Sequence, residues 1–248
     1  MGATKIEFRL RMAIMAMILT LGFSAPWMSL WQMGPRIPLV MWLALELSRH
    51  GLVTFSVGLP LVIVLATLTA AKGMVFRVWG AANLGPAIVI HGKMRGDALV
   101  ASGPYRYVRN PLYIGLWAMT GALAFLMPPT GALFVLIAVP VFLLRLTLGE
   151  EAFLTGELGQ PYRDYLRAVP RLVPRVGSTL PPSTGKPQWL HAVFAEFTSI
   201  GVFFGLASFF WSYNFLFTEK IILVCFGISL VVRALSPKVE QSSSDPPF

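Results

Sequence analysis

Long stretches without a charged residue constrain this chain more than any other feature of its sequence. Three of them cover residues 52–71, 111–144 and 197–218. Because a helix needs about 20 apolar residues to cross the hydrocarbon core of a bilayer, each stretch is long enough to span a membrane. Unpaired backbone amides are too costly in lipid, so such segments must be helical. The sequence therefore predicts an all-α, polytopic integral membrane protein.

About six transmembrane helices are expected from these stretches and their neighbours. They are expected near residues 11–31, 53–72, 112–127, 131–148, 193–212 and 217–234. The third and fourth form a tight hairpin, since Pro128-Pro129-Thr130-Gly131 is turn chemistry. The basic start could belong to a signal peptide, but the apolar run continues to Trp31, which favours a first spanning helix. The segment 39–47 is apolar enough to span, re-enter or lie on the membrane, and these alternatives stay open.

The basic residues predict the orientation. The chain has 20 Lys and Arg against 11 Asp and Glu, a net charge of +9. In a membrane protein such an excess lies in cytoplasmic loops that face anionic headgroups, so it does not indicate a nucleic-acid partner. It collects before the first helix, in two long polar segments (73–110 and 149–191) and in the tail, which places both termini and both segments in the cytoplasm. We divide the chain into N-terminal transmembrane helices (1–72), a core with the candidate site (73–176), C-terminal transmembrane helices (177–235) and a disordered tail (236–248).

The strongest candidate for a functional site is the segment 97–113, which reads D-A-L-V-A-S-G-P-Y-R-Y-V-R-N-P-L-Y. Gly103-Pro104 and Asn110-Pro111 both break regular structure, so the chain turns twice before the third helix. Pro111 suits the first turn of that helix, whose free amides and positive dipole end would stabilise an anionic group. The tyrosines add hydroxyl groups and flat faces for a purine. An interfacial belt of Tyr and Arg that anchors a helix end is the alternative.

A second candidate is the pair Glu150-Glu151, with Arg145 just over one turn earlier. Two carboxylates near the negative end of the fourth helix need compensation, which Arg145 or a cationic ligand would supply. A solvated helix end is the alternative. Arg145 and Glu196 lie at helix ends, where an ionisable side chain is expected to snorkel to water.

The segments 159–165 and 169–174 form a third candidate. Tyr162, Tyr165 and Val169 fall on one face at helical spacing, which suits a short helix lying on the membrane as a lid. Phosphate-binding loops, Gly-rich nucleotide fingerprints and zinc motifs are absent from the sequence. Because the three histidines are scattered and Cys225 is single, no metal site is expected.

Taken together, these segments resemble the membrane methyltransferase superfamily of isoprenylcysteine carboxyl methyltransferases and phospholipid methyltransferases. The family pattern runs as His-x-Leu-Val, Ser/Thr-x-Gly-x-Tyr, Arg-His-Pro-x-Tyr, two helices, a Glu-Glu pair, and Phe-Gly-x-x-Tyr-x-x-Tyr ending in Val-Pro. The matching residues, in the same order, are Leu99-Val100, Ser102-Gly103-Pro104-Tyr105, Arg109-Asn110-Pro111-Leu112-Tyr113, Glu150-Glu151, and Leu158-Gly159 with Tyr162, Tyr165 and Val169-Pro170.

The resemblance implies an enzyme that uses S-adenosyl-L-methionine to methylate a lipophilic acceptor, a membrane lipid or a lipidated substrate. The residues expected to bind this cofactor on the cytoplasmic face are Asp97, Leu99, Val100, Gly103, Tyr105, Arg109, Asn110, Pro111, Tyr113 and Glu150. The candidates for a catalytic role are Asn110, Arg145 and Glu151. An NADPH-dependent enzyme of the sterol-reductase type and a non-enzymatic scaffold or transporter are the alternative functions.

Two departures from the family pattern concern the acceptor. The family's two histidines are Asp97 and Asn110 here, and an amide cannot take a proton near neutral pH. The arginine that binds substrate in the isoprenylcysteine enzymes falls on Leu146, with Arg145 displaced by one position. The resemblance therefore implies the cofactor but leaves the acceptor open.

Overall fold

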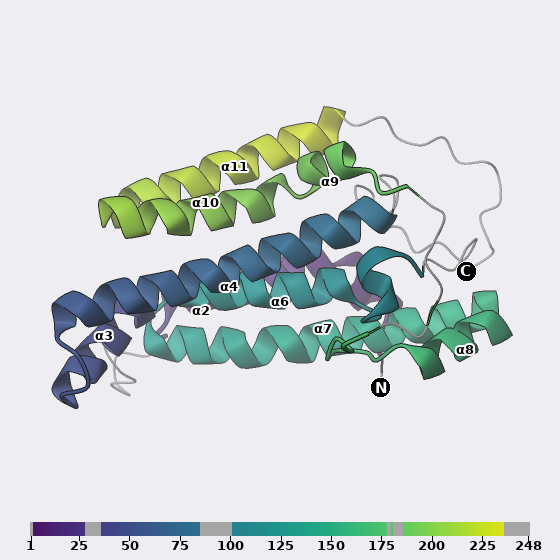
Figure 1. The fold of residues 1–248 in the computed structure, drawn as a ribbon, viewed down its shortest axis with the longest axis horizontal. Coiled ribbons are helices and arrows are strands. Elements are labelled where there is room, and N and C mark those ends of the chain that lie inside the picture. Colours follow the sequence, from purple (N-terminus) through teal and green to yellow (C-terminus); the bar gives the residue numbers. More distant parts are fainter. Residues whose placement is uncertain (1, 28–35, 85–100, 178–179, 181–185, 236–248) are drawn as a thin grey trace.

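Every regular element in the described part of the chain is a helix, which confirms the all-α class (Figure 1). The computed structural model describes residues 2–27, 36–84, 101–177, 180 and 186–235. The elements are α1 (Lys5–Arg9), α2 (Arg11–Ser24), α3 (Leu39–Arg49), α4 (Phe55–Leu84), the 3-10 helix η2 (Gly103–Arg106), α6 (Pro111–Ala124), α7 (Pro129–Leu158), α8 (Gln160–Ala168), α9 (Trp189–Ala195), α10 (Phe197–Ser212) and α11 (Phe215–Leu235).

The predicted count of six membrane spans is not confirmed. Among the described residues, three helices are long and apolar enough to cross a membrane: α4, α7 and the part of α11 over Phe215–Val232. The pair α9 and α10, bent by 69° at its break, makes a fourth if it is counted as one span. α2 and α6 lie where two further spans were expected, but each has 14 residues, fewer than the roughly 20 that a bilayer requires. With 11 residues, α3 is also too short to span alone.

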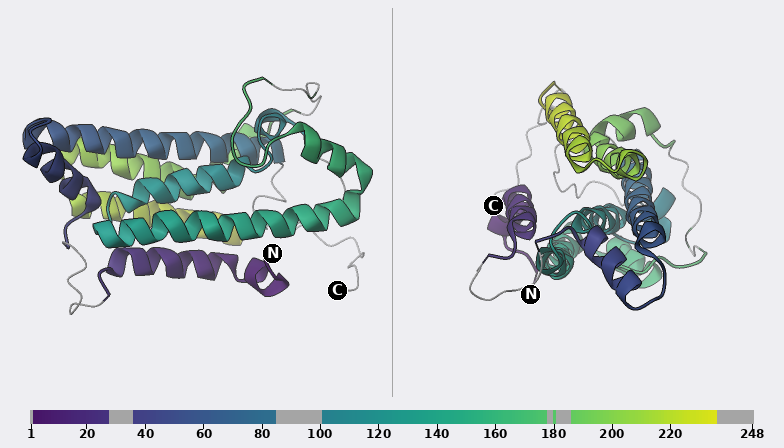
Figure 2. Two further views of the ribbon diagram at one scale, coloured as in Figure 1. Left: turned by 90° about the horizontal axis from the view of Figure 1, so that it is seen from below. Right: turned by 90° about the vertical axis from the view of Figure 1, so that its left-hand side faces the viewer.

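The long helices lie side by side along the molecule. α6 lies between α4 and α7, α2 packs on the outer side of α7, and α10 with α11 covers α4 (Figure 2). The largest buried cluster fills the space between α2, α6 and α7 and includes Met15, Ile18, Met127, Val135 and Val139. The Pro128 break and the hairpin between α6 and α7 are confirmed, and α7 begins at Pro129.

Both long helices continue well past their expected ends. α4 was expected to end near residue 72 and continues to Leu84, and α7 was expected to end near residue 148 and continues to Leu158. A loss of hydropathy marks where an apolar stretch ends, whereas a helix can continue as long as its backbone is paired. Glu150 and Glu151 therefore lie about two turns inside α7 and not at the negative end of its dipole.

Glycines let two pairs of helices approach closely. A Cβ atom on Gly73 of α4 would lie 2.9 Å from the carbonyl oxygen of Gly115 of α6, so the two backbones touch there. In α10, Gly201 and Gly205 form a small-xxx-small pattern that faces α11, and a Cβ on Gly201 would lie 2.1 Å from the Cβ of Cys225. Membrane helices pack through such positions because lipid supplies no hydrophobic driving force between them.

We expect Gly201→Ala to destabilise the α10–α11 pair by about 1–3 kcal/mol, because the added methyl group overpacks the contact with Cys225. Gly227→Ala in α11 is the matched control, since a Cβ there meets no atom within 4 Å. Thermal unfolding of both purified variants in detergent measures the difference. Equal transition temperatures for the two variants would contradict the close packing at Gly201.

Candidate active site

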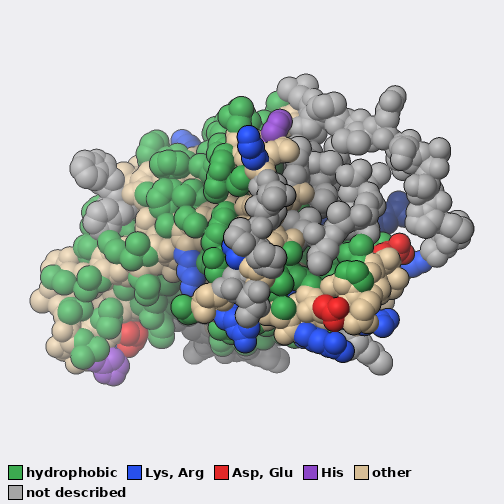
Figure 3. Space-filling model, turned by 45° about the vertical axis from the view of Figure 1, so that its right-hand side comes forward, with side chains coloured by type: hydrophobic (Ala, Val, Ile, Leu, Met, Phe, Trp, Pro, Cys, Tyr) green, Lys and Arg blue, Asp and Glu red, His purple; other side chains and the backbone are tan. Residues whose placement is uncertain are grey.

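The polar side chains gather at the end of the molecule that carries η2, α8 and the last turns of α7. Figure 3 shows charged side chains around this end and a mainly hydrophobic surface over the long helices beside it. Three segments meet here: residues 101–110 leading into α6, the end of α7, and residues 165–175. They contain most of the residues that the sequence singled out.

A tight turn places the first segment against α4. Gly103 has a φ of +51°, a conformation that disfavours residues with a side chain. A Cβ at Gly103 would lie 2.4 Å from the side chain of Asn83, whose amide is itself fixed by a 2.9 Å hydrogen bond to the carbonyl oxygen of Trp79. Gly103 is therefore required by the backbone and by the close approach of α4. Tyr105, on the following turn, is buried.

Hydrogen bonds join the segment 105–109 to the chain that follows α8. The Tyr165 hydroxyl donates to the carbonyl oxygen of Tyr105 at 2.8 Å, and the backbone N–H of Arg109 donates to the carbonyl oxygen of Pro170 at 2.9 Å. Burial raises the pKa of both phenols, Tyr105 and Tyr165, so both remain protonated donors. The predicted helical face of Tyr162, Tyr165 and Val169 is confirmed, and all three side chains are buried.

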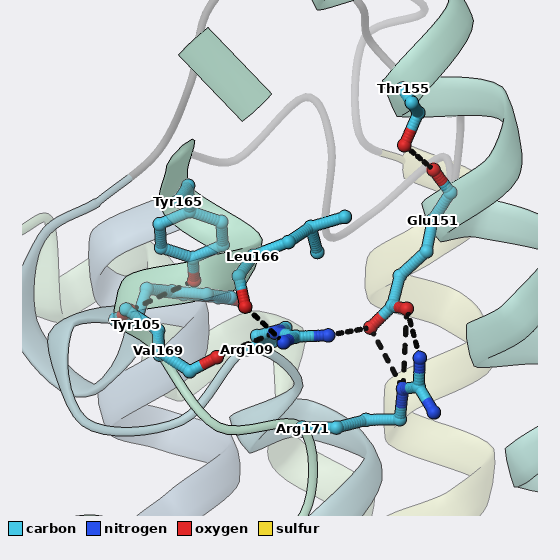
Figure 4. Close-up of polar contacts among 8 residues, drawn as sticks. All are labelled: Tyr105, Arg109, Glu151, Thr155, Tyr165, Leu166, Val169 and Arg171. Carbon is cyan, nitrogen blue, oxygen red and sulfur yellow. Dashed lines mark hydrogen bonds and ion pairs between the residues drawn. The ribbon is translucent and has the colours of Figure 1, made fainter. Parts of the chain in front are cut away.

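Glu151 lies between two arginines (Figure 4). Arg109 donates from Nη1 to Oε1 at 3.0 Å, and Arg171 donates from Nη2 to Oε2 at 2.6 Å. The Arg109 guanidinium also donates through Nε to the carbonyl oxygen of Val169 at 2.6 Å and through Nη2 to that of Leu166. The hydrogen bond to Glu151 raises the pKa of Arg171. Every nitrogen of the Arg109 guanidinium thus has a protein partner, and the cluster ties α7 to both other segments.

Tyr113 and Glu150 make the second contact between α6 and α7. The Tyr113 hydroxyl donates to Oε1 of Glu150 at 2.5 Å. Two buried polar atoms near this contact have no hydrogen-bond partner among the described residues. They are Nδ2 of Asn110, the residue before α6, and Oγ1 of Thr147, three residues before Glu150. A buried amide donor without a partner is costly unless a ligand or water satisfies it. This part of the site therefore has polar groups that a ligand could use.

Arg145 has a different partner from the one that the sequence suggested. It donates from Nη2 to both carboxylate oxygens of Glu7 in α1 at 2.9 Å, while the backbone N–H of Ala3 donates to the Arg145 carbonyl oxygen at 2.8 Å. The hydrogen bond from Arg145 lowers the pKa of Glu7 from 4.5 to about 2. Because the folded state has the depressed pKa, the pair contributes to stability above about pH 4.5 and is lost as the pH falls toward 2. Arg145 thus compensates Glu7 rather than the Glu150-Glu151 pair.

The structure brings together most of the predicted site. Between the start of η2 and the first turn of α6 lie Gly103, Tyr105, Arg109, Asn110, Pro111 and Tyr113. Glu150 contacts this segment through Tyr113. Asp97, Leu99 and Val100 lie outside the described residues. Arg171 belongs to the third candidate, but the sequence predicted neither its ion pair with Glu151 nor that of Glu7 with Arg145. Arg171 directly follows the Val169-Pro170 element, which is the only signal that could have found it.

Comparisons with known proteins place part of the chain beside the methyltransferases. Residues 61–160, which include both the Tyr113–Glu150 and the Arg109–Glu151 contacts, match the family described as phospholipid methyltransferase. The fold and the site thus define a helical integral membrane protein whose central region is similar to the membrane methyltransferases, and the expected resemblance is confirmed for that region.

One curated relative is the protein-S-isoprenylcysteine O-methyltransferase of Schizosaccharomyces pombe. It is 33% identical to this chain over 91 residues, which are 36% of this chain and 38% of that protein. The chain therefore covers well under half the length of this relative. No solved structure matches the chain.

We expect Glu151→Gln to loosen the segment 165–175, because the neutral amide no longer balances Arg109 and Arg171. Breaking a fully buried ion pair costs about 3–5 kcal/mol. The Arg171 side chain is 38% exposed, so solvent screening reduces the expected loss to about 1–3 kcal/mol. Limited proteolysis in this segment, compared with Glu157→Gln at an exposed position of the same helix, measures the effect. Equal cleavage rates in both variants would contradict it.

Proposed function

We propose that this protein is a methyltransferase that binds S-adenosyl-L-methionine at the cytoplasmic end of its helices and methylates a lipophilic acceptor. The observation that carries the proposal is the hydrogen bond between Tyr113 and Glu150. It joins two elements of the family pattern that lie on different helices. The match of residues 61–160 to the phospholipid methyltransferases supports the same conclusion.

The groups around this contact fit the chemistry of the cofactor. Its amino group and sulfonium are cationic, and Glu150 supplies a carboxylate for such a group. Its carboxylate is anionic, and the first turn of α6 supplies free amides and the positive end of a helix dipole. The buried Nδ2 of Asn110 is a further donor that lacks a partner among the described residues. When bound, this cofactor supplies an electrophilic methyl group.

The remaining side chains of the site hold its shape. Arg109, Arg171 and Glu151 satisfy one another and fix the segments that flank Tyr105 and Tyr113. Such positioning, together with the exclusion of water, is what an in-line methyl transfer requires. Arg109 was expected to contact the cofactor and Glu151 to act in catalysis. We therefore propose instead that both residues hold the site in shape.

The paired charges also bear on the acceptor, because they leave no clear general base among the described residues. Among the described residues, Glu151 is held by two arginines and Arg145 by Glu7, and Asn110 cannot accept a proton near neutral pH. An anionic acceptor such as a carboxylate is already nucleophilic and needs no base, whereas an amine must first lose a proton. We propose an anionic acceptor, or a lipid amine that loses its proton to water. The cytoplasmic placement rests on the distribution of basic residues.

We expect Glu150→Gln to weaken binding of S-adenosyl-L-methionine by about 10- to 100-fold, because a charged hydrogen bond contributes about 1.5–3 kcal/mol. Tyr113→Phe should weaken binding by a few fold, since it removes only the hydroxyl that orients Glu150. Equilibrium dialysis with labelled cofactor measures both, with Glu157→Gln as the control. Wild-type protein that binds NADPH and not S-adenosyl-L-methionine would replace the proposal with a reductase, and binding that survives Glu150→Gln would remove Glu150 from the site.

The acceptor can be identified directly. Protein in native lipid is incubated with methyl-labelled S-adenosyl-L-methionine, and the label is followed into extracted lipid and into prenylated cysteine peptides added in a parallel reaction. We expect the label on an anionic group of one of these. A base-stable label on a lipid amine would instead identify a headgroup amine as the acceptor.

A further inference from the structure

A buried ion pair joins α4 to the break between α9 and α10. Arg77 donates from Nε and Nη2 to the two carboxylate oxygens of Glu196, the second bond measuring 2.7 Å, and the Ser199 hydroxyl donates to Oε2 of the same carboxylate at 2.8 Å. The side chain of Glu196 is 2% exposed and that of Arg77 is 18% exposed. The expectation that Glu196 snorkels to water is therefore wrong, because a bidentate partner satisfies it inside the protein.

The same arginine also touches the first turn of α6. Its Nη1 donates to the carbonyl oxygen of Leu112 at 3.4 Å. Gly115 makes room for the arginine, since a Cβ at that position would lie 2.5 Å from the Arg77 Cγ. Leu112 lies between Pro111 and Tyr113, so this contact is made on the turn that presents the candidate cofactor site.

The chemistry of the Arg77–Glu196 pair indicates that it does more than hold the helices together. A buried ion pair gives up the hydration of both charges, and apolar side chains of similar volume fasten helices as well or better. What a bidentate carboxylate adds is direction, because it fixes the plane of the guanidinium and so the position of the third nitrogen. Here that nitrogen points at the start of α6.

We propose that Glu196 is a positioning residue: by holding Arg77 against Leu112, it fixes the first turn of α6 and thereby the geometry of the site formed by Asn110, Tyr113 and Glu150. Glu196 lies outside the region 61–160 that matches the phospholipid methyltransferases. The C-terminal helices thus take part in shaping the site. That the site binds S-adenosyl-L-methionine rests on the proposed function, whereas the ordering of α6 does not.

The test uses the full chain in detergent or nanodiscs, with two test variants and two control variants. Glu196→Gln removes the charge and keeps the volume. The double variant Arg77→Met with Glu196→Leu replaces the ion pair with apolar side chains, which keeps the helices packed without a directed donor. Gly201→Ala loosens α10 against α11 without touching the pair, so it controls for lost stability. Glu219→Gln, at an exposed position of α11, controls for lost charge.

Two measurements distinguish a residue that positions α6 from one that only holds the helices together. Hydrogen exchange of a peptide covering residues 110–118 reports the order of the first turns of α6 without any ligand. We expect exchange at least tenfold faster in Glu196→Gln and in the double variant than in wild type, and wild-type exchange in both controls. We also expect about tenfold weaker binding of S-adenosyl-L-methionine in the same two variants, while the double variant keeps a melting temperature within a few degrees of wild type.

Wild-type exchange and affinity in the double variant would overturn the proposal, because the pair would then only fasten the helices. Equal acceleration in Gly201→Ala and Glu196→Gln would overturn it as well, since any loosening of the C-terminal helices would then suffice. If wild-type protein binds no S-adenosyl-L-methionine, the proposed function fails, and the exchange measurements still decide whether Glu196 positions α6.

Discussion

The touching backbones of α4 and α6 at Gly73 and Gly115 are the constraint on which the rest of this structure depends. A side chain at either glycine would force the two helices apart. Their close approach brings Arg77 of α4 to the first turn of α6, and it puts the end of α4 beside the turn at Gly103. The candidate site is therefore assembled on a helix crossing with no room for adjustment, which suits a site that works by positioning.

Ion pairs between helices and loops hold the surrounding elements in place. Arg109 and Arg171 both pair with Glu151, and Arg145 pairs with Glu7. Arg77 of α4 pairs with Glu196, at the break before α10. Each pair joins segments that lie far apart in the sequence. Glu151 and Glu196 are buried, and a buried charge that loses its partner is strongly unfavourable, so their pairs help to specify which segments meet. Glu150 accepts a hydrogen bond from the neutral hydroxyl of Tyr113, whereas Glu7, Glu151 and Glu196 each accept one from an arginine.

The region similar to the methyltransferases contains the polar groups of the site but not all of its supports. Residues 61–160 carry Asn110, Tyr113 and Glu150. Arg171 follows this region, and α1, which holds Arg145, precedes it. Arg171 therefore supports the candidate site from outside the region that matches the family.

The sequence by itself determined the helical class, the hairpin at Pro128, the face of α8 and the set of residues around Asn110, because hydropathy, turn chemistry and motif spacing are local properties. The helix ends could not be predicted from it, since α4 and α7 continue where hydropathy falls. The count of six spans is not confirmed, because α2 and α6 have only 14 residues each. Only the tertiary structure decided how the charges are shared: Glu151 goes to two arginines, Arg145 to Glu7, and Glu150 to Tyr113. These pairings depend on which distant segments the glycine contacts bring together, and local sequence patterns carry no information about that.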